Sequence, residues 1–132
     1  AEDLVLDWCA QLCFALAHAH DHKILHRDLK PQNVFLLSSG ELRLGDFGIS
    51  RVLSSTLSVA QTCVGTPLYL PPEVCNGEGY DAKCDSWALG ALLYECCALA
   101  TPFTAFNMPA LILCILSNEP EPLPNGYSAQ MR

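Results

Sequence analysis

Hydrophobic side chains near the start of the chain recur with the spacing of an α-helix. Between residues 3 and 21 the apolar positions repeat every three or four residues, at Val5, Trp8, Leu12, Leu16 and Ala19. This spacing is close to the 3.6-residue period of one helix face. Glu2 and Asp3 stand at the start, where acidic groups suit the positive end of the helix dipole. The pattern predicts an amphipathic helix over residues 3–21.

The pattern then changes to two short β-type runs, "NVFLL" (residues 33–37) and "ELRLGDF" (residues 41–47), joined by the turn-like "SSGE". Such runs around small polar residues predict a β-hairpin. Residues 50–66 are mostly small and polar and show no clear period. We expect a long loop there, because loops of that length in compact domains are usually functional or disordered.

The second half of the chain predicts two more helices. Residues 84–99 are apolar nearly all round, which is typical of a buried helix. A further helix runs through "ALILCILS", with Asn107 as its N-cap and Pro109 in its first turn. We expect the Pro-rich tail to be extended. The predicted fold class is therefore mainly α with a small β-hairpin, in one domain over residues 1–132.

Charge and cysteine usage narrow the class of protein. Seven Lys and Arg side chains stand against fourteen Asp and Glu side chains, a net charge of -7. General nucleic-acid binding needs a cationic face, and no basic run suggests an anionic membrane, so we expect neither partner.

The eight cysteines form no C-x-x-C pair and most lie in apolar stretches such as "LLYECCALA". The first residues, "AEDLVLDW", lack the basic n-region of a signal peptide. We therefore expect reduced core cysteines in a cytoplasmic protein.

The stretch "HAHDHKILHRDLKPQN" (residues 18–33) carries four histidines. His18 and His22 have the i, i+4 spacing of zinc ligands, so a His/Cys metal protein is one alternative. The other interpretation is structural: these are polar side chains at the C-terminal end of a helix, where the helix dipole favours cationic or polar groups. We favour the second interpretation, with a catalytic loop beginning directly afterwards.

Two motifs place oxygen ligands around the predicted hairpin, because "HRDLKPQN" precedes it and "GDFG" ends it. Phosphoryl transfer from a nucleotide needs one carboxylate to position the attacking hydroxyl group. It also needs a second carboxylate and an amide oxygen to hold Mg²⁺, and a lysine to neutralise the moving phosphoryl group. Together these motifs are a known signature of protein kinases.

The chain resembles the C-terminal lobe of eukaryotic protein kinases and, more closely, the NIMA-related (NEK) Ser/Thr kinases. The resemblance covers essentially the whole chain and rests on "ILHRDLKPQNVFL", "LGDFGISRVL", "TCVGTPLYLPPEVC", "YDAKCDSWALGALLYE" and "FNMPALILCILS". It implies a protein-kinase-like large lobe, truncated at both ends, with ATP and Mg²⁺ as cofactors and Ser/Thr of protein substrates as acceptors. It also implies a cytoplasmic protein associated with the cytoskeleton, centrosome or cilium.

The resemblance implies roles for the residues that carry the chemistry. Asp28 is the catalytic base, which accepts or orients the proton of the substrate hydroxyl group. Lys30 contacts the γ-phosphate and is typical of Ser/Thr kinases. Asn33 and Asp46 are the Mg²⁺ ligands.

The resemblance also implies regulatory residues. Arg27 pairs with a phosphate on the activation segment, and Thr62 matches the family's activating phosphosite. A phosphate there faces an arginine fork and orders the loop by charge-assisted hydrogen bonds. Thr66 favours Ser/Thr specificity, and residues 65–69 form a wall that receives the substrate residue after the acceptor.

A third set is structural. His26 packs and hydrogen-bonds beside Phe47, Gly48 completes its motif, and Asp85 braces the backbone of the catalytic loop. Glu73 usually pairs with an arginine that this chain does not contain, and Trp87 is expected in the core.

Some features depart from the family's pattern. Pro71 stands where Ala or Ser is usual, and Cys84-Asp85-Ser86 replaces Ser-Asp-Ile. The 132 residues contain no Gly-rich loop, strand lysine or partnering helix glutamate, so the small lobe of the same kinase is an expected partner and the isolated fragment is expected to be inactive. The alternative function is a non-catalytic, pseudokinase-like interaction module.

Overall fold

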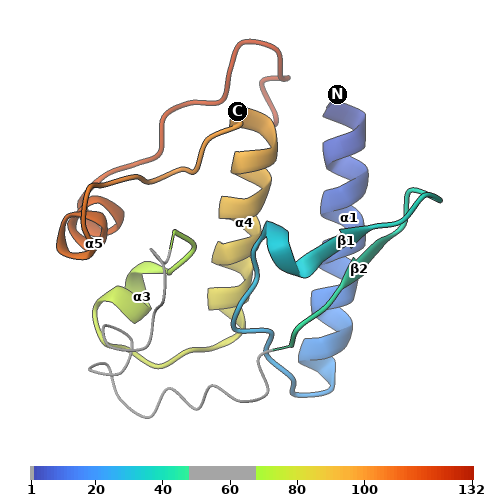
Figure 1. Cartoon of the computed structure of the whole chain (residues 1–132), viewed down its shortest axis with the longest axis horizontal. Helices are drawn as coiled ribbons and strands as arrows, with labels where there is room; N and C mark the ends of the chain where they lie inside the picture. The colour runs from blue at the N-terminus through green and yellow to red at the C-terminus, as the bar shows by residue number, and fades with distance from the viewer. Residues whose placement is uncertain (1, 48–67) are drawn as a thin grey trace.

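A computed structural model describes residues 2–47 and 68–132, which are mainly helical with one two-stranded antiparallel sheet (Figure 1). The elements in chain order are helix α1 (Glu2–Asp21), the 3₁₀ turn η1 (Pro31–Asn33), strands β1 (Val34–Leu36) and β2 (Leu42–Leu44), and helices α3 (Pro72–Cys75), α4 (Ala82–Ala98) and α5 (Met108–Ser117). The predicted mixture of helices and one hairpin is confirmed. The predicted loop at 50–66, with Thr62 and Thr66, lies outside the described residues, as does Gly48.

The core forms where α1 and α4 lie side by side and run in opposite directions (Figure 1). Its buried members come from α1, the following loop and α4: Leu12, Leu16, Leu29, Ala88, Leu89 and Leu92. The hairpin packs on this core through Val34, Leu42 and Leu44. The predicted inner face of α1 is confirmed at four of its five positions, since only Trp8 is partly exposed.

Helix α4 begins two residues before the predicted start because Asp81 caps it. The Asp81 side chain accepts a hydrogen bond from the Lys83 amide at 2.8 Å, and the Asp81 amide donates to Cys84 Sγ at 3.4 Å. This reciprocal pair is a capping box, which satisfies amides at the helix start. The predicted N-cap of α5 is confirmed, because Asn107 Oδ1 accepts from the Ala110 amide at 2.9 Å.

Helix α5 contributes Leu111 and Ile115 to a second core cluster, in which they pack with Phe103. Trp87 of α4 is partly buried against this cluster and stacks on Phe103 with ring centroids 6.0 Å apart. Helix α3 was not predicted, because the Pro-rich "PLYLPPE" shows no helical period. Pro72 opens this short helix, and proline is tolerated there because the first amides of a helix have no partner within it.

The prediction of reduced core cysteines is confirmed in part, because the seven described cysteines are free and five of them are either buried or packed against a core cluster. Cys84 and Cys97 are buried, whereas Cys13 is exposed and the others are intermediate. An apolar stretch on a helix still turns one face to solvent, so its cysteines do not share one environment. Among the described helices, none has the length and apolar character needed to cross a bilayer.

Candidate active site

The loop between α1 and β1 holds most of the predicted site. Helix α1 ends in a turn in which Lys23 has a φ of 62° and the Ile24 amide donates to the Ala19 carbonyl at 2.9 Å. The chain turns again at Arg27, whose φ is 67°. This is the left-handed region, which costs about 1–2 kcal/mol for a residue other than glycine. A conformation of this kind persists only where surrounding contacts hold it.

Asp85 supplies those contacts from the start of α4. Its carboxylate is fully buried and accepts hydrogen bonds from the amides of His26 and Arg27, each at 2.9 Å. The Tyr80 hydroxyl donates to Oδ1 at 2.7 Å, and His20 Nε2 lies 2.8 Å from Oδ2. Burial alone would raise the pKa of Asp85, but the hydrogen bonds from Tyr80, His20 and the two amides outweigh it and hold the pKa below its ordinary value of 3.8.

Asp28 is the half-exposed carboxylate at the centre of the loop. Lys30 Nζ donates to Asp28 Oδ2 at 2.8 Å, and Asn33 Nδ2 lies 3.2 Å from the same oxygen. Asn33 Nδ2 also donates to the Asp28 carbonyl at 2.7 Å, which folds the loop around the η1 turn. The amide nitrogen of the buried Asn33 side chain is therefore committed to Asp28, which leaves its amide oxygen as an acceptor.

Asp46 reaches the same end of the hairpin as Asn33. The strands pair with Val34 opposite Leu44, and the Gly45 amide extends the ladder by donating to the Asn33 carbonyl at 2.9 Å. Asp46 follows directly, is exposed and has a φ of 52°. The hairpin thus begins and ends on oxygen-bearing side chains, one amide and one carboxylate. Hard oxygen ligands of this type fit Mg²⁺.

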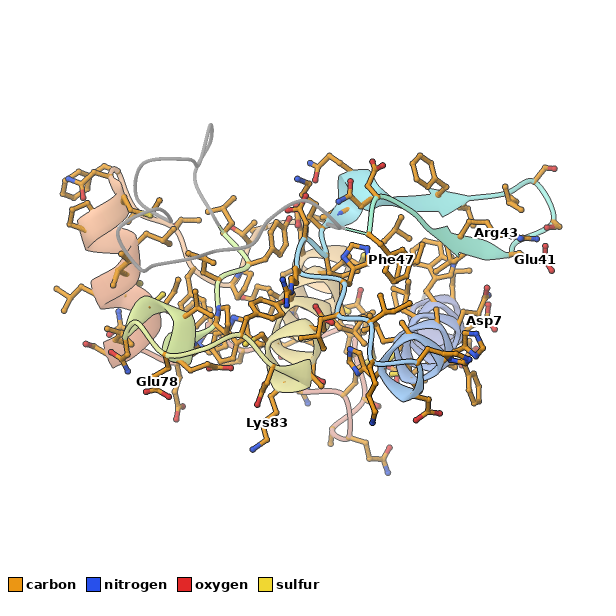
Figure 2. All side chains as sticks on the ribbon, turned by 90° about the horizontal axis from the view of Figure 1, so that it is seen from below. Asp7, Glu41, Arg43, Phe47, Glu78 and Lys83 are labelled. Atoms are coloured by element: carbon orange, nitrogen blue, oxygen red, sulfur yellow. The ribbon has the colours of Figure 1, made fainter. Side chains whose placement is uncertain are left out.

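His26 ties the loop to the returning strand. It is fully buried, its Nε2 lies 3.0 Å from the Gly45 carbonyl, and its ring centroid is 4.8 Å from that of Phe47. Figure 2 shows Phe47 where the hairpin returns to the centre of the molecule. The Asp28 amide donates to His26 Nδ1 at 3.3 Å. Nδ1 therefore accepts and Nε2 donates, which fixes one neutral tautomer of the ring.

Sequence reasoning missed several residues that hold this site. His20 joins Asp85 from the end of α1 and Tyr80 joins it from just before α4, and no local pattern marks either residue. Gln11 of α1 fixes the hairpin, since its Oε1 accepts from the Leu42 amide at 2.8 Å. Tyr69, at the end of the predicted substrate wall, donates to Glu95 of α4 at 2.5 Å.

The helix-end histidines do not converge on a common point. The rings of His18 and His22 lie 4.4 Å apart, and His22 Nδ1 is 2.8 Å from the His18 carbonyl, while His20 faces Asp85. Over residues 2–47 and 68–132, the group of His, Cys, Asp and Glu side chains with metal-like spacing is Glu73, Asp81 and Cys84. Burial raises the pKa of the Cys84 thiol to about 11, so in the absence of a metal ion this thiol is protonated at pH 7.

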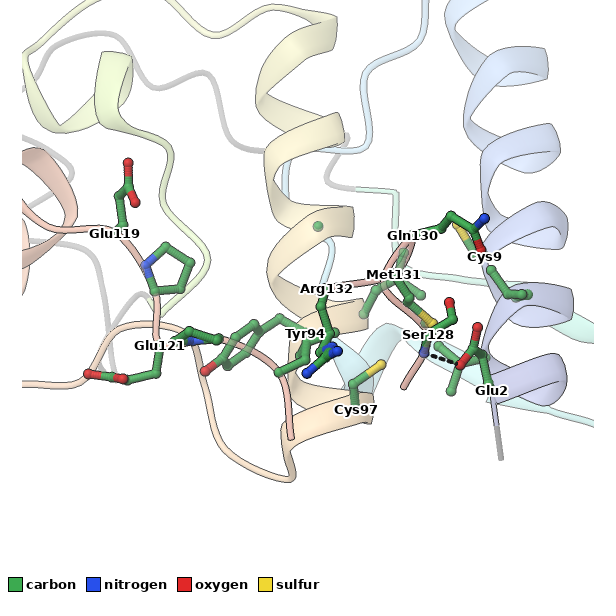
Figure 3. Close-up of a pocket in the computed structure, with 17 residues that line it drawn as sticks. Glu2, Cys9, Tyr94, Cys97, Glu119, Glu121, Ser128, Gln130, Met131 and Arg132 are labelled. Atoms are coloured by element: carbon green, nitrogen blue, oxygen red, sulfur yellow. Dashed lines mark hydrogen bonds between the residues drawn. The ribbon is translucent and has the colours of Figure 1, made fainter. Parts of the chain in front are cut away.

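A cavity of about 750 Å³ lies at the other end of α1, between the C-terminal half of α4 and the tail (Figure 3). The Ser128 amide donates to Glu2 Oε2 at 2.7 Å, and the Tyr127 hydroxyl lies 3.2 Å from the Cys97 carbonyl. These bonds draw the tail over the cavity. An α-helix of twenty residues is about 30 Å long, so this cavity is remote from Asp28.

Comparison with known proteins identifies the group to which these motifs belong. A family model described as "Protein kinase domain" matches residues 1–118. Serine/threonine-protein kinase Nek1 of Mus musculus is 53% identical over 131 residues, which cover 99% of this chain and 11% of that protein. Serine/threonine-protein kinase Nek5 of Homo sapiens is 46% identical over 132 residues, 99% of this chain and 19% of that protein. Putative serine/threonine-protein kinase A of Trypanosoma brucei brucei is 46% identical over 124 residues, 92% of this chain and 29% of that protein.

The chain therefore spans less than a third of the length of each of these relatives. The match to the family model nevertheless takes in the loop, the hairpin and helices α1, α3, α4 and α5. The chain belongs to the protein kinase domain family, and over nearly its whole length its sequence is similar to those of the Nek serine/threonine kinases.

Proposed function

We propose that the chain works as the large, C-terminal lobe of a NIMA-related kinase, which transfers the γ-phosphate of ATP to Ser or Thr of protein substrates. The observation that carries the proposal is the grouping of Asp28, Lys30 and Asn33 around one carboxylate oxygen, with Asp46 at the same end of the hairpin. The protein kinase family supplies the reaction class.

In this proposal each side chain has one task. Asp28 orients the substrate hydroxyl group and accepts its proton. Its carboxylate is half-exposed, which leaves it accessible to a substrate, and the donors Lys30 and Asn33 hold it in position. Lys30 lies beside it and offers positive charge to the transferred group. Asn33 and Asp46 would hold Mg²⁺ through their side-chain oxygens. When bound, ATP supplies the phosphoryl group and Mg²⁺ supplies the neutralising charge.

Regulation follows from the same loop. We assign to Arg27 the pairing with phosphorylated Thr62, and to Thr66 a part in selecting Ser/Thr acceptors. His26, Phe47, Gly48, Glu73 and Asp85 hold the framework.

A chimera tests the proposal. The small lobe of mouse Nek1 would be joined to this chain, and Ser/Thr phosphorylation of casein measured with Mg-ATP. The original Nek1 kinase domain serves as the active reference. We expect Asp28→Asn to lower the rate by about 10²–10⁴-fold, the range for loss of a general base.

The second candidate is a non-catalytic, pseudokinase-like interaction module. It predicts that the chimera and its Asp28→Asn variant are equally inert while the Nek1 reference is active. That outcome would reject the catalytic proposal.

A further inference from the structure

Helix α5 is apolar on every side. Its sequence, "MPALILCILS", has no charged residue and Ser117 as its single hydroxyl side chain. The inner side is accounted for, because Leu111 and Ile115 are buried on Phe103. A helix that is hydrophobic all round is normally buried all round. The outer side of α5 therefore needs an explanation.

The outer side carries a continuous apolar stripe, which we call the outer stripe: Phe106, Pro109, Leu113 and Leu116. Phe106 is 93% exposed, Leu113 65% and Leu116 40%. Their spacings of three and four residues place them on one side of the helix and its N-terminal approach. With a rise of 1.5 Å per residue, the stripe runs for about 15 Å, or roughly three helical turns. Exposed apolar surfaces of this kind mark binding sites.

The charges around the outer stripe are acidic. Glu119 and Glu121 directly follow α5 and are exposed, and no lysine or arginine occurs between residues 84 and 131. Arg132 is the basic residue near them, since it lines the cavity of Figure 3 together with both glutamates. Glu78 follows α3, which packs against α5, and Figure 2 shows it on that side of the molecule. A surface with an apolar centre and an acidic surround complements a partner with apolar anchors and basic flanks.

This charge also argues against two other occupants. A second copy of the chain carries the same net charge of -7, so two copies repel each other, whereas a basic partner is attracted. An anionic membrane surface would repel the carboxylates of Glu119 and Glu121.

We propose that the outer stripe binds an amphipathic helical segment of another protein, with apolar side chains on one face and Lys or Arg around them. The binding mode is a helix laid along a hydrophobic surface. Helix α5 and the hairpin lie at opposite edges of the molecule in Figures 1 and 2, so a segment bound there leaves the Asp28 loop uncovered. The inference does not depend on the proposed kinase activity.

Fluorescence anisotropy with the full 132-residue chain tests this surface. The probe is a labelled helical peptide with Leu on one face and Lys elsewhere. Its matched controls are a peptide of the same composition with the Leu positions scrambled and a peptide with Glu in place of Lys. We expect the first peptide to bind more tightly than both controls, and to weaken as salt is raised, because surface charge is screened.

Two variants locate the binding. Leu113→Asp should weaken the Leu/Lys peptide at least tenfold, whereas Leu99→Asp should not change its affinity. Leu99 is 89% exposed and has a φ of 55°, a conformation that Asp tolerates, so it is a matched control outside the outer stripe. Glu119→Lys with Glu121→Lys should weaken the Leu/Lys peptide and strengthen the Leu/Glu peptide.

Three results would overturn the proposal. One is equal binding of the scrambled peptide, and another is equal loss in the two Asp variants. The third is self-association of the chain, or binding to anionic vesicles, that Leu113→Asp abolishes while peptide binding stays undetectable. Those outcomes would assign the surface to a second copy or to lipid.

Discussion

Replacing Asp85 by alanine removes a buried carboxylate that holds the loop in place. The substitution leaves two backbone amides without their acceptor, the buried amide of His26 and the part-buried amide of Arg27, and it also frees Tyr80 and His20. Each buried donor without a partner costs about 1–3 kcal/mol. We therefore expect Asp85→Ala to lower the free energy of unfolding by about 3–5 kcal/mol.

Two milder variants keep the test measurable, because a loss of that size can approach the total stability of a domain, about 5–15 kcal/mol. Asp85→Asn retains one acceptor oxygen but turns an amide NH₂ group toward two of the four donors, so we expect a loss of about 1–3 kcal/mol. Tyr80→Phe leaves both backbone amides paired, and about 1 kcal/mol should be lost. Urea unfolding at pH 7, followed by circular dichroism, gives all three values. Equal stability of Asp85→Ala and Tyr80→Phe would refute the reasoning.

The pH dependence gives a second readout. The pKa of Asp85 is lowered in the folded state, so the carboxylate stabilises the fold above its unfolded pKa, and this contribution is lost as the pH falls through the folded pKa. The stability difference between the wild-type chain and Asp85→Asn should therefore be largest near neutral pH and narrow below about pH 4. A constant difference across that range would mean that ionisation of Asp85 does not contribute.

Three further substitutions test local features. Gln11→Ala should speed hydrogen exchange of the Leu42 amide, because its acceptor is lost, with a cost of about 1 kcal/mol. Gly45→Ala should displace the Phe35 ring, since a Cβ at Gly45 would lie 2.7 Å from Phe35 Cε2, and the shift is visible in the NMR spectrum of that ring. Asn107→Ala should remove the cap of α5 and lower the unfolding free energy by about 1 kcal/mol in a urea titration.

Each of these predictions has a matched control. Gln11→Glu keeps an acceptor for the amide and should retain protection that Gln11→Ala loses. Gly40→Ala should leave the Phe35 ring in place, because nothing lies within 4 Å of a Cβ at Gly40, although its φ of 89° adds strain. Asn107→Ser keeps a capping oxygen and should stay close to the wild-type stability. Indistinguishable behaviour of a variant and its control would contradict the assigned contact.

The long periodic elements could be predicted from sequence, because their signals are local. The repeat on α1 and the cap at Asn107 needed only neighbouring positions, and both are present. The start of α4 was placed late because Asp81, the capping residue, does not belong to the apolar pattern. Helix α3 is a single turn rich in proline and gives no periodic signal.

The candidate site divides in the same way. Asp28, Lys30 and Asn33 lie within six positions, so their spacing alone was enough to expect them together. The contact of His20 with Asp85 spans 65 residues, and that of Gln11 with Leu42 spans 31. Such contacts are set by how α1 packs on α4 and on the hairpin, which no short window of sequence contains.

The bonds made by Asp85 bear on how this chain tolerates changes in length. They join points 58 and 59 residues apart and so fix both ends of the intervening chain independently of its path. Lengthening a flexible loop costs little, about 0.6 kcal/mol for each doubling. Residues inserted into the exposed stretch 76–79 between α3 and α4 should therefore leave the loop around Asp28 in place, which makes that stretch a natural position for a grafted epitope or an inserted domain.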